Sequence, residues 1–180
     1  KKCIGCWAAD YNKALNLSFE QLDKLFTEGK ELGIYFYIMT GGEPLVRKKD
    51  ILRLAEKHDD CVFMIFTNGT LIDQQFCDDL CRLGNIVPTI SVEGFGDATD
   101  GRRGKGSWKD IMRAMDLMKL NKVPFGFSTC FTTANCDSVL SDKFIDLIFF
   151  IYSSAIFFIF LGNMHITTPF QYLTFFLLIY

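Results

Sequence analysis

The sequence has little of what marks a secreted, zinc-binding or nucleic-acid-binding protein. Two histidines among 180 residues, neither near a pair of cysteines, are too few for a common zinc site. The net charge of −2 gives no electrostatic footprint for binding nucleic acid. Seven cysteines are too few for a small secreted disulfide scaffold, and no stretch resembles a signal peptide. We therefore expect a cytoplasmic protein in a reducing compartment, without a nucleic-acid partner.

Charge is absent from the last part of the chain. All 19 basic and 21 acidic residues lie in residues 1–146, and residues 147–180 contain none. This change predicts a core of residues 1–146 followed by an uncharged apolar tail. Three interpretations of the tail stay open: a buried strand at Ile156–Gly162, a tail anchor that gives membrane contact through residues 147–164, and a coding artefact such as a frame disruption near Leu147.

What is present is an alternation of amphipathic helices with short apolar strands. Helices are expected at residues 17–33, 48–58, 71–84 and 107–121, and strands at residues 34–40, 61–67, 86–92 and 123–132. Ser18, Asp50 and Ser107 are the predicted helix N-caps. Strands that are apolar on both faces are typical of a parallel sheet covered by helices. In such sheets and barrels the ligand site forms at the carboxyl ends of the strands.

Five of the seven cysteines have a simple structural interpretation. We expect them to be buried as small apolar residues: Cys61, Cys77, Cys81, Cys130 and Cys136. Cys77 and Cys81 are one helical turn apart, but no third ligand stands near them, so they do not predict a metal site.

Polar turns that contain glycine follow three successive predicted strands. They are TGGEP at Thr40–Pro44, TNGT at Thr67–Thr70 and SVEG at Ser91–Gly94. Each alone is an ordinary turn sequence, but together they predict a rim that could hold a small polar molecule. The Cys3-x-x-Cys6 pair precedes the first helix, as though on a loop at the same rim.

This order of motifs resembles the radical S-adenosylmethionine (radical SAM) superfamily, whose signature is C-x-x-x-C-x-x-C. Cys3 and Cys6 match the second and third cysteines of that signature, and GGEP at Gly41–Pro44 matches a further motif of the family. Gly5 is a departure, because many members have an aromatic residue just before the third cysteine. The first cysteine would lie two positions before the printed sequence begins. The resemblance implies an α/β fold, a partial (β/α)6 radical SAM barrel truncated at its N-terminus and with an atypical apolar C-terminus.

The resemblance also implies a reaction. Family members use a [4Fe–4S] cluster, held by three thiolates, to cleave S-adenosylmethionine reductively into a 5'-deoxyadenosyl radical, which abstracts hydrogen from a substrate. For this chain a peptide and a small molecule are equally compatible substrates. The implied partner is an electron donor such as ferredoxin or flavodoxin.

By the same resemblance, Cys3 and Cys6 are the expected iron ligands. The turn at Gly41, Gly42, Glu43 and Pro44 would receive the methionine ammonium group of S-adenosylmethionine. Ser91 and Glu93 would face the ribose hydroxyls or the amino-acid part, and Arg103 would bind the carboxylate, a role for which Arg102 competes. No residue that acts on the substrate is identified.

Two other functions stay open at this point. One is a noncatalytic α/β domain with a CxxC metal or redox pair. A thioredoxin-like pair, however, needs a strand just before it and a helix within or directly after it, whereas the first predicted helix here begins near Ser18. The other is an inactive fragment of a radical SAM enzyme.

Overall fold

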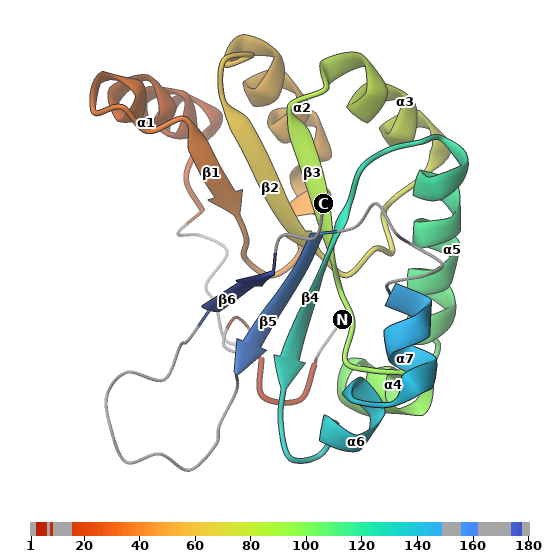
Figure 1. The fold of residues 1–180 in the computed structure, drawn as a ribbon. Coiled ribbons are helices and arrows are strands. Elements are labelled where there is room, and N and C mark those ends of the chain that lie inside the picture. Colours follow the sequence, from red (N-terminus) through yellow and green to blue (C-terminus); the bar gives the residue numbers. More distant parts are fainter. Residues whose placement is uncertain (1–2, 7, 9–15, 149–155, 162–173, 178–180) are drawn as a thin grey trace, which may run out of the picture.

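The computed structural model describes residues 3–6, 8, 16–148, 156–161 and 174–177 (Figure 1). These residues contain a six-stranded sheet in which the order of the strands in space follows their order in the sequence. The strands are β1 (Phe36–Met39), β2 (Val62–Thr67), β3 (Ile86–Ser91), β4 (Gly126–Phe131), β5 (Ile156–Leu161) and β6 (Thr174–Leu177). Neighbours from β1 to β5 are parallel, and β6 is antiparallel to β5.

One helix precedes the first parallel strand, and the others connect the strands that follow. They are α1 (Phe19–Glu31), the 3-10 turn η2 (Pro44–Arg47), α2 (Lys48–Lys57), α3 (Gln74–Leu83), α4 (Asp97–Arg103), α5 (Ser107–Leu120), α6 (Cys136–Val139) and α7 (Asp142–Asp146). Helices α2, α3 and α5 line one face of the sheet, which curls around its other face like part of a barrel (Figure 1). The predicted alternation of helices with parallel strands is confirmed.

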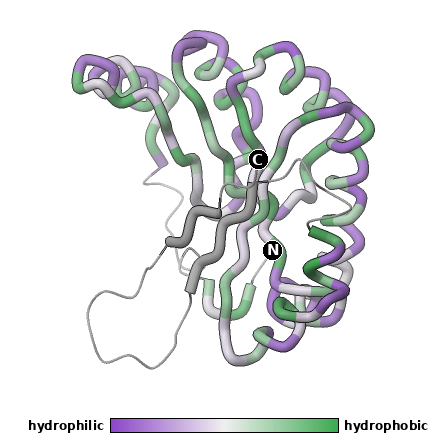
Figure 2. Tube along the Cα trace, viewed as in Figure 1, coloured by the Kyte–Doolittle hydropathy of each residue, from purple (hydrophilic) through white to green (hydrophobic). Residues whose placement is uncertain are grey.

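The core lies between the sheet and these helices. Phe63 and Ile65 of β2, Ile90 of β3 and Phe127 of β4 are 0% exposed. They pack in one cluster with residues of α2, α3 and α5, and the apolar side of each helix faces the strands (Figure 2). Because alternate residues of a strand point to opposite faces, the neighbours of these residues point into the curl of the sheet.

The N-terminus of α1 is the one that the sequence predicts best. The Ser18 hydroxyl accepts a hydrogen bond from the Gln21 N–H at 3.2 Å, and the Gln21 side chain accepts one from the Ser18 N–H at 2.7 Å. This reciprocal pair is a capping box, and it satisfies two backbone donors that the helix leaves free.

The predicted caps at Asp50 and Ser107 are wrong. Pro44 starts the turn η2, which runs directly into α2, so Asp50 lies inside the first turn of α2 and binds Arg47 at 2.8 Å. Ser107 is the first residue of α5, and it donates to the Arg103 carbonyl instead. The capping acceptor there is Asp100 of the preceding helix, because its carboxylate binds the N–H groups of residues 106 and 108.

Burial differs from the expectation at several positions. Strand β1 lies at an edge of the sheet rather than inside it, so Phe36 and Ile38 are 48% and 50% exposed. Among the five cysteines expected to be buried, only Cys61 and Cys77 are; Cys81 is exposed on α3, and Cys130 and Cys136 are half-buried. Those three lie near the ends of elements: Cys81 in the last turn of α3, Cys130 one residue before the end of β4 and Cys136 at the start of α6.

The described part of the tail belongs to the sheet. Strand β5 continues the parallel series beside β4, from the pair Gly126 and Ile156 to the pair Phe131 and Leu161. Residues 149–155 and 162–173 lie outside the described residues, and most of the stretch considered as a tail anchor falls on them. None of the helices in the described part of the chain has both the length and the apolar character of a membrane span.

A buried histidine joins α1 to α2. The ring of His58 is 2% exposed, and its Nε2 lies 2.9 Å from an oxygen of Asp23. The second Asp23 oxygen accepts from Lys57 at 2.6 Å. Hydrogen bonds from Lys57 and then from His58 hold the pKa of Asp23 below its ordinary value of 3.8.

This lowered pKa predicts an acid-sensitive contact. The folded-state pKa of Asp23 lies below the unfolded one, so its stabilising effect is present above the ordinary pKa and is lost as the pH falls through the folded value. We expect the urea concentration at the midpoint of unfolding to decrease as the pH is lowered from about 5 to about 2. In Asp23→Asn this decrease should be smaller. Glu28→Gln, which alters an exposed pair with Lys24, is the control and should keep the original slope. Identical slopes in all three proteins, followed by circular dichroism, would contradict the assignment.

Candidate functional site

Glu43 connects the ends of β1 and β2. One oxygen of its carboxylate accepts from the Leu45 N–H at 3.1 Å and from the Thr67 hydroxyl at 2.7 Å, and the other accepts from the Asn68 N–H at 2.9 Å. The carboxylate therefore caps η2 and ties the GGEP turn to the TNGT turn. Through these three contacts the GGEP and TNGT turns lie side by side and form one rim at the ends of β1 and β2.

The two glycines before Glu43 present an open stretch of backbone. A Cβ placed on Gly41 or on Gly42 would meet no heavy atom within 4 Å. A ligand can therefore approach this turn without a side chain in its way. The sequence predicted this feature correctly from the glycines alone.

Removing the Glu43 carboxylate leaves the Thr67 hydroxyl and two backbone N–H groups without their acceptor. We expect Glu43→Ala to lower the free energy of unfolding by about 2 kcal/mol, measured by urea denaturation. Glu28→Ala, a surface carboxylate that is 59% exposed, should cost less than about 0.5 kcal/mol. Equal losses in the two variants would show that Glu43 does not hold the rim together.

Serines of β3 and β4 point into the curl of the sheet. Ser91 and Ser128 are register partners, so their side chains lie on the same face. Their neighbours Ile90, Val92 and Phe127 pack toward the helices, and the serines therefore point the opposite way. Ser91 is half-buried and Ser128 is 8% exposed. Two hydroxyls thus face the inside of the partial barrel near the carboxyl end of the strands.

Glu93 follows β3 and is 0% exposed. One carboxylate oxygen accepts from Arg102 and from both Nε and Nη2 of Arg103, with Nε at 2.8 Å. The other oxygen accepts from the Cys130 N–H at 3.0 Å. The structure therefore places the predicted residues Glu93 and Arg103 together, with the competing Arg102 beside them, in one buried ionic cluster. Burial raises the pKa of the neighbouring Cys130 thiol.

The cysteine turn lies against the end of α4. The Ile4 N–H donates to the Arg102 carbonyl at 2.9 Å, and the Cys6 N–H donates to the Cys3 carbonyl at 3.2 Å. Gly5 between them has a φ of +68°, a conformation that an aromatic residue adopts only with strain, which accounts for glycine at this position. Cys3 and Cys6 are half-buried free thiols.

The donor set of this turn fits iron only in part. Thiolates are the ligands of iron–sulfur clusters, and Cys3 and Cys6 supply two of them. Within the described ranges no group of three or more His, Cys, Asp or Glu side chains gathers in metal-binding geometry.

Sequence reasoning missed several residues that build the rim. Helix α4 is not among the predicted helices, because two aspartates, Thr99 and Gly101 among its seven residues give a poor helical signal. Thr99 and Asn135 were not singled out, although each bonds the backbone of Glu93: the Glu93 N–H donates to the Thr99 hydroxyl at 3.0 Å, and Asn135 Nδ2 donates to the Glu93 carbonyl at 3.1 Å. No local pattern signals these partners.

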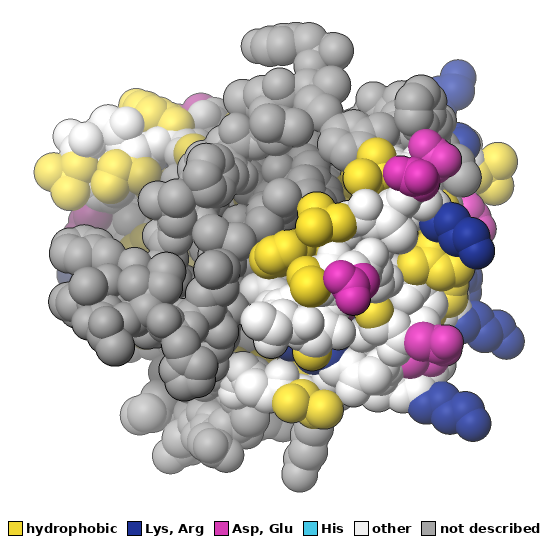
Figure 3. Space-filling model, turned by 60° about the horizontal axis from the view of Figure 1, so that its bottom comes forward, with side chains coloured by type: hydrophobic (Ala, Val, Ile, Leu, Met, Phe, Trp, Pro, Cys, Tyr) yellow, Lys and Arg dark blue, Asp and Glu magenta, His cyan; other side chains and the backbone are white. Residues whose placement is uncertain are grey.

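Figure 3 looks onto the face toward which β4 and β5 point. In the part of this face that is not grey, hydrophobic side chains gather near the middle, and lysine and arginine side chains lie along the outer margin (Figure 3). The carboxyl ends of the strands therefore combine apolar surface with charge.

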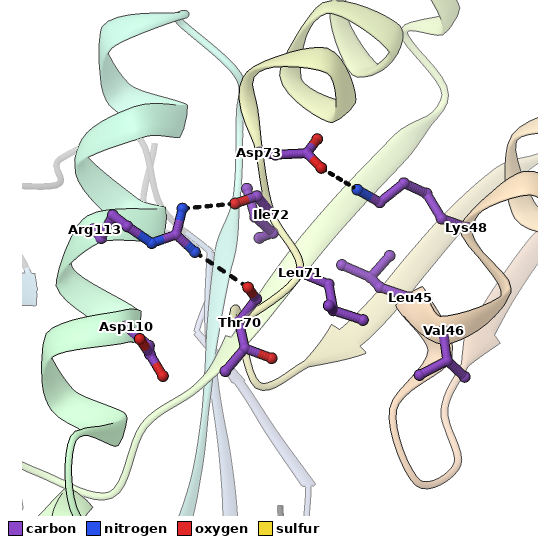
Figure 4. Close-up of a pocket in the computed structure, with 9 residues that line it drawn as sticks. All are labelled: Leu45, Val46, Lys48, Thr70, Leu71, Ile72, Asp73, Asp110 and Arg113. Carbon is purple, nitrogen blue, oxygen red and sulfur yellow. Dashed lines mark hydrogen bonds and ion pairs between the residues drawn. The ribbon is translucent and has the colours of Figure 1, made fainter.

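An open hollow of about 740 Å³ lies beside the Glu43 rim, between η2, the loop after β2 and α5 (Figure 4). Arg113 reaches across it to the Ile72 carbonyl at 2.8 Å, and Lys48 pairs with Asp73 at 2.8 Å. These contacts fix the loop that carries the TNGT turn. In these contacts Arg113, Lys48 and Asp73 bind groups of the protein itself.

The sequence profile of the Radical SAM superfamily matches residues 1–140. The chain belongs to the radical SAM superfamily. Its curled parallel sheet is accordingly part of a radical SAM (β/α) barrel, and the fold class predicted from the sequence is confirmed.

Several curated relatives of this radical SAM chain are named as enzymes. GTP 3',8-cyclase of Campylobacter lari is 31% identical over 178 residues, which cover 91% of this chain and 53% of that protein. Fe-coproporphyrin III synthase of Methanosarcina barkeri is 31% identical over 63% of this chain and 30% of its own length. Pre-heme d1 synthase of Dinoroseobacter shibae is 26% identical over 79% of this chain and 39% of its own length. The chain thus spans about a third to a half of the relatives it matches.

Solved structures share the fold. Native anSMEcpe, with bound AdoMet and Cp18Cys peptide, has a TM-score of 0.68 and 19% identity over 95% of this chain and 50% of its own. Streptococcus suis SuiB bound to S-adenosylmethionine has a TM-score of 0.72 and 18% identity over 95% of this chain and 39% of its own. At these identities the likeness shows the radical SAM fold.

Proposed function

We propose that this chain is the catalytic core of an enzyme that cleaves S-adenosylmethionine reductively and abstracts hydrogen from a substrate. The observation that carries the proposal is the hydrogen bond from Ile4 to the Arg102 carbonyl. It brings the turn that carries Cys3 and Cys6 to the end of α4, where Arg102 and Arg103 bind Glu93. Family membership supports the same reaction class.

Cys3 and Cys6 would hold two irons of a [4Fe–4S] cluster, and the third thiolate would come from a cysteine two positions before Lys1. When bound and reduced, such a cluster supplies the electron that cleaves S-adenosylmethionine to a 5'-deoxyadenosyl radical. The open turn at Gly41 and Gly42 would receive the methionine ammonium group through backbone carbonyls.

The remaining cofactor contacts come from the inside of the partial barrel. Ser91 points there and would bind a ribose hydroxyl. Arg103 keeps donor groups beyond those that bind Glu93, because a guanidinium carries five N–H groups, and would bind the methionine carboxylate. Pro44 fixes the exit of the turn through its ring. Glu43 and Glu93 hold these elements in place through the contacts described above.

Related proteins support two classes of substrate. SuiB was solved with the precursor peptide SuiA and anSMEcpe with a peptide, whereas the named relatives include GTP 3',8-cyclase. We therefore keep a peptide or a small molecule as the substrate, and a ferredoxin or flavodoxin as the electron donor. We assign residues 1–146 to the core in a cytoplasmic enzyme, and residues 156–161 to a further barrel strand, in line with the pairing of β4 and β5.

The test is product formation. The chain, with the upstream cysteine present, is loaded with iron and sulfide without oxygen, reduced, and given S-adenosylmethionine. The expected products are 5'-deoxyadenosine and methionine in equal amounts, separated by chromatography. A loaded and reduced protein that leaves S-adenosylmethionine intact would overturn the proposal.

A further inference from the structure

Glu93 is a buried carboxylate of the rim, and both of its oxygens accept hydrogen bonds. It is 0% exposed, and its carboxylate accepts hydrogen bonds from two arginines and from the N–H of Cys130. Its own N–H and carbonyl are bound by Thr99 and Asn135. A side chain that is enclosed on every side is placed to hold other groups in position rather than to meet a ligand.

Helix α4 depends on this carboxylate. It has seven residues, it contains Gly101, and the backbone at its start receives no side-chain cap from Gly96. A helix this short is marginal by itself. Both arginines of its last turn bind Glu93, so the carboxylate fixes the C-terminal end of α4 against the ends of β3 and β4. Without the negative charge, two guanidinium groups would face each other in a partly buried place.

The end of α4 in turn holds the cysteine turn, because the Arg102 carbonyl accepts from the Ile4 N–H at 2.9 Å. We propose that Glu93 is a positioning residue that sets the place of the Cys3–Cys6 turn through Arg102. The chain of contacts runs from the Glu93 carboxylate to the Arg102 side chain, along the Arg102 backbone, and to Ile4. The proposal rests on the proposed function only in treating the turn as the cluster loop.

Amide hydrogen exchange at Ile4 tests whether Glu93 holds the contact between Ile4 and Arg102. The measurement is made on protein without an iron–sulfur cluster. The readout is the exchange rate of the Ile4 N–H relative to that of the Ile65 N–H in the core strand β2. We expect Glu93→Gln to raise this ratio about tenfold or more, because the neutral amide cannot accept from both arginines and Cys130 at once. Glu93→Asp, which keeps the charge, should restore much of the protection. A variant that only destabilises the whole fold would speed both amides and leave the ratio unchanged.

Asp23→Asn is the matched control. Asp23 is also a carboxylate that binds two basic side chains, Lys57 and His58, but it joins α1 to α2. We expect this variant to leave the ratio unchanged. If Glu93→Gln does not fold, Arg102→Ala serves instead, because its side chain is 22% exposed and its carbonyl remains. It should raise the ratio several-fold.

Three results would overturn the proposal: an Ile4 amide that is unprotected in the original chain, an unchanged ratio in the folded Glu93 and Arg102 variants, or an equal rise in Asp23→Asn. The measurement needs neither iron nor S-adenosylmethionine. A protein that shows the expected exchange but cleaves no S-adenosylmethionine would therefore sink the proposed function and leave the positioning role intact.

Discussion

Cys3→Ser and Cys6→Ser are each expected to abolish cluster binding and lower S-adenosylmethionine cleavage by at least about a thousandfold. Clusters of this type are held by thiolates, and a serine hydroxyl is not ionised near neutral pH. Both cysteines are free thiols in the turn that is bonded to α4. The measurement is iron per chain after anaerobic loading, about four in the protein that has the upstream cysteine present, together with the yield of 5'-deoxyadenosine.

Cys81→Ser is the control for this experiment. Cys81 is also a free cysteine, exposed on α3, where its thiol lies 3.5 Å from the Asn121 carbonyl. It should bind iron and form product as the original chain does. Full iron loading of Cys3→Ser and Cys6→Ser would contradict their assignment as ligands.

Gly94→Ala is expected to destabilise the fold by about 3 kcal/mol. Gly94 is buried with a φ of +106°, which an alanine adopts only with strain. A Cβ there would lie 2.7 Å from the Ser138 hydroxyl oxygen and 3.3 Å from the Val139 nitrogen. Since the same hydroxyl accepts from the Phe95 N–H at 2.8 Å, the clash would also open the loop between β3 and α4.

Gly101→Ala is the matched control for Gly94→Ala. Gly101 lies in α4 at an exposed position, where an added Cβ would meet no atom within 4 Å. Alanine is the better helix former, so this variant should gain about 0.5 to 1 kcal/mol. Urea denaturation measures both changes. A neutral Gly94→Ala, or a loss in Gly101→Ala as large as in Gly94→Ala, would show that the loop is not held as described.

The sequence predicted the features that depend on short-range patterns. Alternating helices and strands, the capping box at Ser18 and the open Gly41–Gly42 turn all follow from residues within a few positions of each other. The order of the parallel strands does not follow from the alternation, because doubly wound sheets alternate in the same way with other strand orders; the barrel order came from the resemblance to the radical SAM superfamily.

The interior of the site was not predictable in this way. Glu93 takes its partners from Arg102, Arg103, Cys130 and Asn135, up to 42 positions away. Helix α4 has two aspartates, Thr99 and Gly101 among its seven residues, all weak helix formers, and both arginines of its last turn bind Glu93. The cap that Asp100 provides to α5, in place of Ser107, is likewise a contact between two elements. Such contacts join residues of different elements that are far apart in the sequence. A single sequence reveals them only where the residues belong to a motif that is already known.

The most direct test of the central claim is the electron paramagnetic resonance spectrum of the reduced, cluster-loaded chain, with the upstream cysteine present, recorded with and without S-adenosylmethionine. If Cys3, Cys6 and the Gly41–Gly42 turn form one site, addition of S-adenosylmethionine changes the signal, and Gly42→Val weakens this change while the iron content stays the same. A spectrum that does not respond to S-adenosylmethionine, in protein with a full complement of iron, would contradict the account.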